Sequence, residues 1–387
     1  MSASLDNTLG AALKVRKKQR LLRVRQVYDG PQGAELTIAG RRYVNFCSND
    51  YLGLARDPAL KRALSDGAAR FGVGSGASPL VCGHNSSHQA LEAELATFTG
   101  RERALVFSTG YMANLGVVST LAGRGDWVVE DRLNHASLID AAILSRARLR
   151  RYPHVDVAAL ERILAQSASQ NKLVLTDGVF SMDGDRAPLA AIARICARHG
   201  AWLMVDDAHG MGVLGKTGAG SLEVVGLGME AVPILMGTFG KAFGVFGAFV
   251  AGSHVLIESL IQAARSYVYT TALPPALAET IRVSLRLVRA GSERRKHLSA
   301  LIGRFTTKAA ERGLPLTGSD TPIQPLILGE PSKAVAVSEA LKARGILIVP
   351  IRPPSVPKGT ARLRVTLSAA HSEDQVDHLV DALAAVL

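Results

Sequence analysis

The 387-residue sequence predicts an α/β fold with a mostly parallel sheet, followed by a smaller α+β domain at the C-terminal end. Two observations lead to this class. From about residue 55 to 285, short apolar runs alternate with helical patterns, which is typical of strands that are joined by crossover helices. The runs are continuously apolar and do not alternate with polar residues, as expected of strands that are covered on both faces.

Six apolar runs are the expected strands of the large sheet: 104–107, 127–129, 173–175, 202–205, 233–236 and 246–251. The helical patterns between and after them are 112–121, 138–145, 157–166, 189–198 and 255–264. These periodicities predict one large domain over residues 55–285.

The two ends of the chain differ from this pattern. Residues 8–28 are predicted to form a basic amphipathic helix, and residues 34–44 a short hairpin, so 1–54 is treated as an N-terminal segment. After a long helix, the C-terminal part mixes helices and strands and is predicted as a small α+β domain over 286–387. The long helix is expected at 276–290. The elements expected after it are strands at 323–328, 347–349 and 362–366, and helices at 334–343 and 373–386.

Composition favours an ordinary globular enzyme. The chain is 48% hydrophobic and 20% charged, and no apolar stretch reaches the roughly 18–20 residues that a membrane-spanning helix needs. Three cysteines without CxxC spacing favour a reduced compartment without a disulfide framework, so we expect a cytoplasmic protein.

The net charge is 45 basic minus 33 acidic residues, or +12, and part of the excess lies in two clusters at 14–25 and 146–151. Such clusters have three interpretations: nucleic-acid binding, solvated helix faces, or attraction of anionic small molecules. No aromatic residues interleave them, which argues against a platform for single-stranded nucleic acid. We expect no nucleic-acid partner and favour solvated helix faces.

Lys241 is the most informative residue. It lies in the segment GTFGKAFG at 237–244, directly after an apolar run, and no carboxylate lies within ten residues of it. An amine in apolar surroundings loses its charge readily and becomes a nucleophile near neutral pH. Covalent binding of a carbonyl cofactor requires such an amine. On its own, a lysine in a glycine-rich loop also has a purely structural explanation.

Polar residues follow the other apolar runs where each predicted strand ends. Ligands bind beyond the carboxyl ends of the strands in an open parallel sheet, so these residues are expected to share one site. Each has a simpler explanation alone, such as a helix cap for His135, an N-cap for Asp207 or a turn for Ser181. In strand order the residues are Gly110, Tyr111 and Met112; His135; Asp177 and Ser181; Asp206, Asp207 and His209; and Thr238 with Lys241.

Pyridoxal phosphate is the cofactor that explains this set. Lys241 is the amine for its aldehyde. Asp206 would keep its pyridine nitrogen protonated, an ion pair worth on the order of 4 kcal/mol at an effective dielectric near 20. His209 and Ser181 suit the phenolic oxygen, and His135 suits the ring face. The phosphate is expected where free backbone amides open a helix, and the residues assigned to it are Gly110, Tyr111, Met112 and Thr238.

Six motifs then carry a family resemblance: SNDYLGL at 48–54, GSG at 74–76, HAS at 135–137, FSMDG at 180–184, DDAHG at 206–210 and TFGK at 238–241. They make the chain similar, nearly end to end, to the α-oxoamine synthases, a pyridoxal-phosphate family of fold type I, the aspartate-aminotransferase-like fold. The resemblance implies a condensation of an amino acid with an acyl thioester and loss of CO2, with Lys241, His135 and Asp206 as the catalytic residues.

The resemblance also implies substrate contacts. Asn49 and Arg352 would hold the amino-acid or product carboxylate, with Arg364 nearby, and His135 would aid substrate binding. Arg23 would reach the acyl chain, and Ser355 stands where the family often has a threonine in contact with substrate.

A shared active site follows from the resemblance as well. Thr270 and Thr271 are similar to residues that reach the cofactor phosphate of the partner subunit, which implies a homodimer. Pro79 departs from the small or basic residue of many relatives, which concerns substrate contacts and not the cofactor.

Within the family, three segments favour the member that joins L-alanine to a pimeloyl thioester in biotin biosynthesis: IQPL at 323–326, IRPPSVP at 351–357 and TARLR at 360–364. The acyl carrier, coenzyme A or an acyl carrier protein, stays open. The alternative is a sister activity, glycine C-acetyltransferase or serine palmitoyltransferase.

Two other patterns lead to no site. The glycines at 72–76 have the wrong spacing for a dinucleotide loop and follow a helix. His84 and His88 lie four apart, as a metal pair would, but lack a nearby third ligand, so no metal is expected. His371 and His378 are expected at the surface.

Overall fold

The computed structural model describes residues 4–387, which form two compact units. The large unit comprises 52–181 and 186–295. The small unit comprises the chain up to Tyr51, the short excursion 182–185, and 296–387. The boundaries expected from the sequence lay after residues 54 and 285. The excursion has no signal in the composition, because three of its four residues lie within the FSMDG motif at 180–184, which was assigned to the cofactor site.

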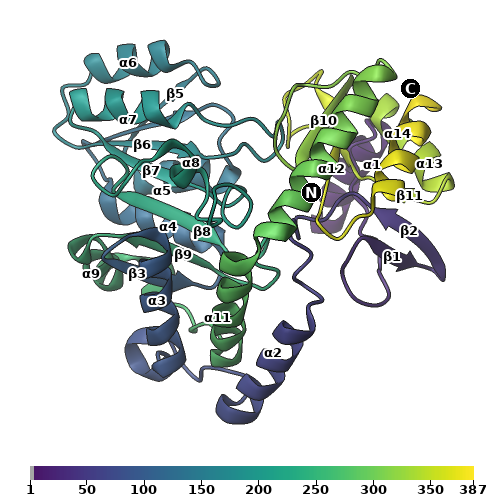
Figure 1. The fold of residues 1–387 in the computed structure, drawn as a ribbon. Coiled ribbons are helices and arrows are strands. Elements are labelled where there is room, and N and C mark those ends of the chain that lie inside the picture. Colours follow the sequence, from purple (N-terminus) through teal and green to yellow (C-terminus); the bar gives the residue numbers. More distant parts are fainter. Residues whose placement is uncertain (1–3) are drawn as a thin grey trace. The chain divides into compact units, whose positions relative to one another are not determined.

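The large unit is built on a seven-stranded sheet with the strand order β3-β9-β8-β7-β6-β4-β5 (Figure 1). Strand β9 alone runs opposite to the other six strands, so the predicted α/β class with a mostly parallel sheet is confirmed. The strands are β3 Arg103–Phe107, β4 Trp127–Asp131, β5 Arg148–Tyr152, β6 Lys172–Asp177, β7 Trp202–Asp206, β8 Ile234–Thr238 and β9 Ala248–Gly252.

The apolar pattern of the sequence does not predict strand β5. It is the edge strand beside β4, and it contains three of the clustered arginines. The guanidinium carbons of Arg148 and Arg150 lie 4.9 and 5.4 Å from the centre of the Trp127 ring. Charged side chains on an edge strand discourage pairing with another chain. The interpretation of this cluster as a helix face is therefore wrong, because an edge strand needs no continuous apolar run.

Helices α4, α5 and α9 pack against one face of the large sheet and share a fully apolar core with it, including Val117, Leu138, Met204 and Leu260. Each fully buried aliphatic side chain contributes about 1.5–3 kcal/mol. The helices of this unit are α2 Pro58–Phe71, α3 Ser86–Thr99, α4 Gly110–Leu121, α5 Ala136–Ser145, α6 Val157–Ala165, α7 Leu189–Arg198, α8 Ser221–Val225, α9 His254–Ala263, α10 Arg265–Val268 and α11 Pro275–Ala290, with a π-helical turn, η1, at Pro79–Gly83.

The small unit has two three-stranded sheets, in the orders β1-β2-β11 and β10-β13-β12. The predicted hairpin is present as an antiparallel β1-β2 pair. The elements are α1 Leu5–Lys18, β1 Glu35–Ile38, β2 Arg41–Asn45, β10 Ile323–Gly329, α13 Pro331–Ala343, β11 Ile346–Leu347, β12 Pro350–Ile351, β13 Ala361–Thr366 and α14 Glu373–Ala384; α12, Ser292–Glu311, spans the boundary between the units.

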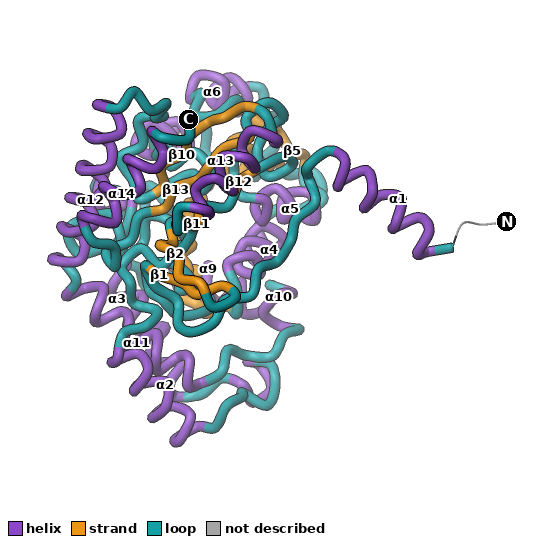
Figure 2. Tube along the Cα trace, turned by 90° about the vertical axis from the view of Figure 1, so that its right-hand side faces the viewer, coloured by secondary structure: helices purple, strands orange, loops and turns teal. Residues whose placement is uncertain are grey.

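The N-terminal helix is shorter than expected. Helix α1 ends at Lys18, and residues 21–28 have no regular secondary structure. Arg20 adopts a left-handed conformation with φ of 56°, which a helix cannot continue through. None of the residues of α1 is buried, and Figure 2 shows this helix projecting clear of the other elements of its unit.

Over residues 4–387, none of the helices combines the length and apolarity that crossing a membrane would need.

Candidate active site

A cavity of about 190 Å³ lies at the carboxyl ends of β6, β7 and β8 in the large unit. The cavity gathers seven of the residues that the sequence assigned to a cofactor, and with them Ser137, Asp177, Ala208 and Met236. The seven are Gly110, Tyr111, His135, Asp206, His209, Thr238 and Lys241.

Lys241 is held beside His209. Its Nζ lies 3.0 Å from Nε2 of His209, which is itself buried. The neighbouring side chains of Phe239 and Phe243 are fully buried and fix the loop on the apolar core. Lys241 itself is half-buried and lines the cavity. The apolar residues that flank Lys241 in the sequence thus anchor the loop that carries its amine.

Asp206 ends β7 with its carboxylate on the cavity wall, and the residue is only 3% exposed. Both carboxylate oxygens are held: the backbone N–H of Ala208 donates to Oδ1 at 3.0 Å, and Nδ2 of Asn114 donates to Oδ2 at 2.8 Å. Two donors on one carboxylate give a fixed negative charge, as a protonated ring nitrogen requires.

The start of α4 offers an anion site. Thr109 caps the helix, and its hydroxyl accepts from the N–H of Met112 at 3.2 Å. The amides of Gly110 and Tyr111 find no acceptor among the described residues, so they are free donors at the positive end of a helix dipole. The N–H of Met112 would have to give up its bond to the Thr109 hydroxyl before it could donate to an anion. Thr238 lines the same cavity, and its hydroxyl donates to the carbonyl of Gly247 at 2.9 Å.

His135 caps α5 from the cavity wall. Its backbone N–H donates to Oδ2 of Asp177 at 2.7 Å, and its Nδ1 lies 2.7 Å from Oγ of Ser137. Desolvation lowers the pKa of His135 from its ordinary value, while Asp206 acts in the opposite direction. Burial and the charge of Asp206 raise the pKa of Asp177 well above its usual range. The cavity therefore favours a neutral imidazole.

Asp207, next to Asp206, points away from this chemistry. It is fully buried and accepts from both the N–H and the hydroxyl of Ser221, at 2.7 and 2.5 Å. A Cβ added to Gly178, Gly210 or Gly220 would come within 2.4 Å of its carboxylate, so all three must be glycine. Burial raises its pKa to about 7. Asp207 is thus the centre of a packed loop and not the N-cap that the sequence allowed.

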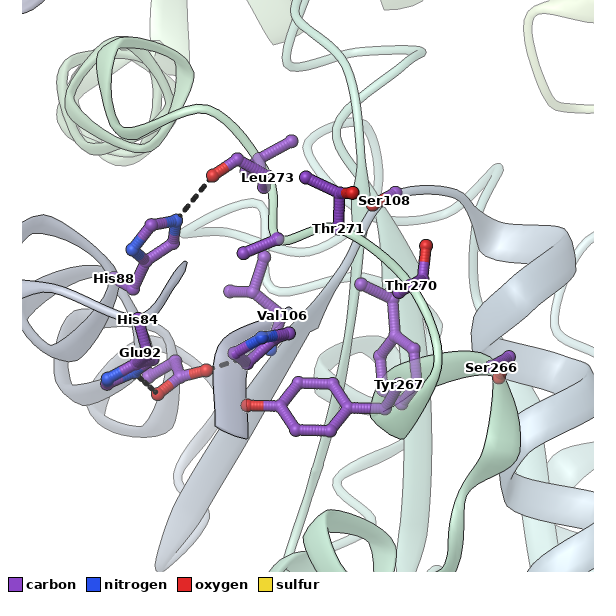
Figure 3. Close-up of a pocket in the computed structure, with 13 residues that line it drawn as sticks. His84, His88, Glu92, Val106, Ser108, Ser266, Tyr267, Thr270, Thr271 and Leu273 are labelled. Atoms are coloured by element: carbon purple, nitrogen blue, oxygen red, sulfur yellow. Dashed lines mark hydrogen bonds and ion pairs between the residues drawn. The ribbon is translucent and has the colours of Figure 1, made fainter. Parts of the chain in front are cut away.

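Four of the residues assigned to the cofactor lie outside the walls of this cavity. Met112 and Ser181 are half-buried nearby in sequence, within α4 and in the turn after β6. Thr270 and Thr271 line a second, narrower cavity of the large unit together with Ser108 and Tyr267 (Figure 3).

The wall of this second cavity is a hydrogen-bonded array. Nε2 of His88 donates to the carbonyl of Leu273 at 2.6 Å, and His84 lies 3.2 Å from the carboxylate of Glu92 (Figure 3). The bond to Glu92 raises the pKa of His84, whereas burial lowers that of His88. The two histidines thus hold a carboxylate and a carbonyl, and over residues 4–387 no group of three metal-binding side chains forms.

Apart from His135, which lies in the large unit, the residues assigned to substrate lie in the small unit and form two groups. Buried Arg364 donates to Oδ1 of Asn49 at 3.1 Å and to the hydroxyl of Thr366 at 2.8 Å. In the second group, Arg23 donates to the hydroxyl of Ser355 at 2.9 Å.

Arg352 belongs to the second group. It donates to the backbone carbonyl of Arg20. Burial and the nearby charge of Arg23 lower its pKa from the ordinary value. Arg352 therefore lies in a cationic neighbourhood, which suits an anionic ligand.

Residues 41–383 match the aminotransferase class I and II family. The chain belongs to that family. It is 57% identical to the 8-amino-7-oxononanoate synthase of Cellvibrio japonicus strain Ueda107, over all of this chain and 97% of that one. It is 60% identical to the enzyme of the same name from Methylococcus capsulatus strain Bath, over 97% of each chain. The resemblance found in the motifs is thereby confirmed.

Solved structures of the same fold include a serine palmitoyltransferase from S. paucimobilis with bound pyridoxal phosphate and myriocin, with a TM-score of 0.94 and 31% identity over 99% of this chain and 98% of that one. The structure of the 8-amino-7-oxononanoate synthase of Francisella tularensis has a TM-score of 0.79 and is 32% identical, over 89% of this chain and 97% of that one. The fold does not separate the two activities within the aminotransferase class I and II family, whereas the higher sequence identities favour one of them.

Proposed function

We propose that the chain catalyses the decarboxylative condensation of L-alanine with a pimeloyl thioester, which yields 8-amino-7-oxononanoate, CO2 and a free thiol. The observation that carries this choice is the 57–60% identity, over nearly the whole chain, to relatives named for this product. Of the sister activities, serine palmitoyltransferase is represented among the solved structures, at 31–34% identity.

The cavity at the strand ends fits pyridoxal phosphate. It combines one amine, one carboxylate with two fixed donors, a flat imidazole and the free amides of α4. Lys241 would bind the aldehyde, Asp206 the ring nitrogen and His209 the phenolic oxygen, while Gly110 and Tyr111 would bind the phosphate. Ser181, Met112 and Thr238 are further candidates for these polar edges.

When bound, this cofactor supplies an electron sink for charge that develops at the substrate Cα. Lys241 takes the proton from Cα and later returns one, and general base catalysis of this kind contributes about 10²–10⁴-fold. His209, 3.0 Å from Nζ, holds the amine in place between these steps.

His135 covers the ring face and closes one wall of the cavity against water. Asp206 holds its negative charge against the ring nitrogen throughout. Because both side chains are fixed by hydrogen bonds in the free protein, little reorganisation is needed when charge develops.

The small-unit residues are proposed to hold the substrates. Arg364 with Asn49, and Arg352, would bind the amino-acid or product carboxylate, and Arg23 with Ser355 would contact the acyl chain. Thr270 and Thr271 would bind the cofactor phosphate of the partner in a cytoplasmic homodimer. The surplus of basic residues suits either of the two acidic acyl carriers, coenzyme A or an acyl carrier protein.

The function is tested by offering L-alanine, glycine and L-serine in turn with pimeloyl, acetyl and palmitoyl thioesters, and by measuring thiol release and product mass. Release with alanine and pimeloyl at least tenfold faster than with any other pair supports the proposal. A preference for serine with palmitoyl, or for glycine with acetyl, would show that a sister activity is correct. Offering pimeloyl on coenzyme A and on the carrier protein then identifies the donor.

A further inference from the structure

Asn114 joins two walls of the cofactor cavity. It lies on α4, is fully buried, and was not singled out in the sequence. Its Nδ2 donates to Oδ2 of Asp206 at 2.8 Å and to Oγ of Ser137 at 2.8 Å. Oγ of Ser137 in turn lies 2.7 Å from Nδ1 of His135. A continuous chain of short hydrogen bonds therefore runs from Asp206 to His135.

The direction of these bonds follows from the donor inventory. An amide nitrogen has two hydrogens, and both are used, one on Asp206 and one on Ser137. The Ser137 oxygen thus accepts from Asn114, and its own hydrogen is available for Nδ1 of His135. The backbone N–H of Ser137 also donates to Nδ1, at 3.3 Å. Nδ1 is therefore an acceptor, and the imidazole proton lies on Nε2.

The amide cannot be turned around. Rotation by 180° would place Oδ1 of Asn114 against the carboxylate of Asp206, where two acceptors would repel. In the observed orientation Oδ1 is buried and has no hydrogen-bond partner within residues 4–387. An unsatisfied buried acceptor costs about 1–3 kcal/mol, and asparagine is a poor residue for a helix interior. A costly residue whose nitrogen makes two bonds at the cavity indicates a role there.

We infer that Asn114 and Ser137 are positioning residues, which hold His135 neutral with its proton on Nε2 and couple it to the carboxylate of Asp206. This inference rests on the proposed function in one respect, namely that His135 and Asp206 hold the same cofactor ring.

A fixed neutral imidazole has a chemical purpose in this site. A cofactor ring nitrogen held against Asp206 would be protonated, so a charged His135 on the face of that ring would bring two positive charges together. Donors on Nδ1 stabilise the neutral form of His135 and disfavour its charged form. Nε2 carries the proton and has no partner among the described residues, which leaves it free to donate to a substrate.

Four ionisable side chains lie around His135. They are Asp206 at the end of β7, Asp177 at the end of β6, Lys241 after β8, and Asp140 on the same helix as the ring. The carboxylates of Asp206 and Asp140 favour the charged imidazole, and Lys241 opposes it. The hydrogen bonds from Asn114 through Ser137 to His135 therefore favour the neutral imidazole, as desolvation does, and oppose the effect of the two carboxylates.

The test is a pH titration of the full-length chain with 15N-labelled histidine, followed by NMR with and without pyridoxal phosphate. His135→Gln identifies the resonances of His135. In the unaltered chain we expect His135 to have a protonated Nε2 and an unprotonated Nδ1, and to titrate with a midpoint below pH 6.5. Asn114→Asp replaces the donor with an acceptor, so the Ser137 hydroxyl turns away from Nδ1. Ser137→Ala removes that hydroxyl while the backbone donor stays.

Both variants should raise the midpoint of His135, shift the proton distribution between its two nitrogens, and weaken cofactor binding by on the order of tenfold, or 1.4 kcal/mol. Ser119→Ala is the control, because that exposed hydroxyl on α4 bonds only to carbonyls of its own helix.

The inference is overturned if both folded variants keep the midpoint and the nitrogen shifts of the unaltered chain. Should Asn114→Asp fail to fold, Ser137→Ala alone decides. The titration needs no turnover. If it shows the expected effect of Asn114 and Ser137 on His135 while the condensation assay fails, the proposed function is refuted and this inference stands.

Discussion

The cofactor cavity of the large unit and the arginine groups of the small unit are built in different ways. In the cavity, short side chains such as Asp206 and His135 are held by backbone amides or by buried neighbours. In the small unit, Arg23 and Ser355 are exposed and bond to each other through a long, flexible side chain. The cavity is thus organised before any ligand arrives, whereas the arginines must exchange one partner for another when a ligand binds.

This difference has an energetic meaning. Groups that stabilise developing charge act best when they are fixed in advance, and holding reacting groups in place supplies a large share of catalysis. Groups that only select a substrate can exchange a protein partner for a ligand at little net cost. Substitutions in the cavity should therefore affect turnover, and those in the small unit should affect substrate affinity.

Replacement of Lys241 should have the largest effect. Lys241→Ala removes both the amine for the cofactor and the base for Cα, so turnover should fall by more than about 10⁴-fold, and the visible absorbance of the lysine-bound cofactor should disappear. Lys216→Ala, at an exposed loop lysine of the same unit, is the control. If the absorbance survives in Lys241→Ala, the assignment is wrong.

Asp206 and Asp207 offer the next comparison, because adjacent carboxylates have different environments. Asp206→Ala removes an ion pair of about 4 kcal/mol, so kcat should fall by about 10³-fold. Asp207→Ala should leave kcat much less affected but lower the free energy of unfolding by about 1–3 kcal/mol, because donors of Ser221 lose their acceptor. Comparable losses of kcat in both variants would remove the argument for the ring nitrogen.

Burial in the large unit also makes stability depend on pH. Glu130 is fully buried, and burial raises its pKa to about 7, although Nε of Arg151, 3.6 Å from Oε1, acts in the opposite direction. Since the folded state keeps this proton while the unfolded chain loses it near pH 4.5, stability should fall as the pH rises from about 4.5 to 7.

Glu130→Gln should therefore be more stable than the unaltered chain above pH 7, by on the order of 3 kcal/mol, and equal to it below pH 4.5. Urea unfolding at several pH values measures this difference, in which the contributions of other titrating groups cancel. A constant difference across the pH range would show that Glu130 is ionised in the folded protein.

Arg364 should show a smaller effect, and on a different quantity. Arg364→Gln removes a charged donor, which is worth about 1.5–3 kcal/mol, so KM for L-alanine should rise about 10–150-fold. Cofactor affinity should stay unchanged. Arg312→Gln, which breaks an exposed ion pair with Asp381 in the same unit, is the control. A loss of cofactor without a change in KM would contradict the division of roles.

The smallest effect is expected at Arg23. It is exposed and bonds to an exposed serine, and such surface contacts contribute at most about 1 kcal/mol. Arg23→Ala should therefore raise KM for the pimeloyl thioester by fivefold or less and leave KM for alanine unchanged. A change in the alanine KM alone would assign Arg23 to the carboxylate and not to the acyl chain.

The difference between buried and exposed segments also explains which parts of the structure the sequence predicts. The six apolar strands were found because strands buried on both faces are continuously apolar, and the polar residues that end them lie at one edge by geometry. Strand β5 was missed because an edge strand rich in arginine carries no such signal. The helix expected over 8–28 was too long because charge periodicity continues past the point where the backbone turns at Arg20.

Within the site, the sequence found residues whose type suggests chemistry and missed those that act through others. Asn114 lies in the middle of a helix and resembles any polar residue there, so no local pattern marks it. His371 was expected at the surface, but it is buried against Phe46 and bonds to the carbonyl of Asn45. Both assignments depend on contacts between distant segments, which periodicity cannot reveal.

The central claim is that the amine of Lys241 binds the aldehyde of pyridoxal phosphate. Reduction of the purified protein with borohydride in the presence of this cofactor makes that bond permanent, and peptide mass spectrometry then locates it. We expect a single modified lysine, Lys241, in nearly every chain. Modification spread over surface lysines, or concentrated on any other lysine, would contradict it.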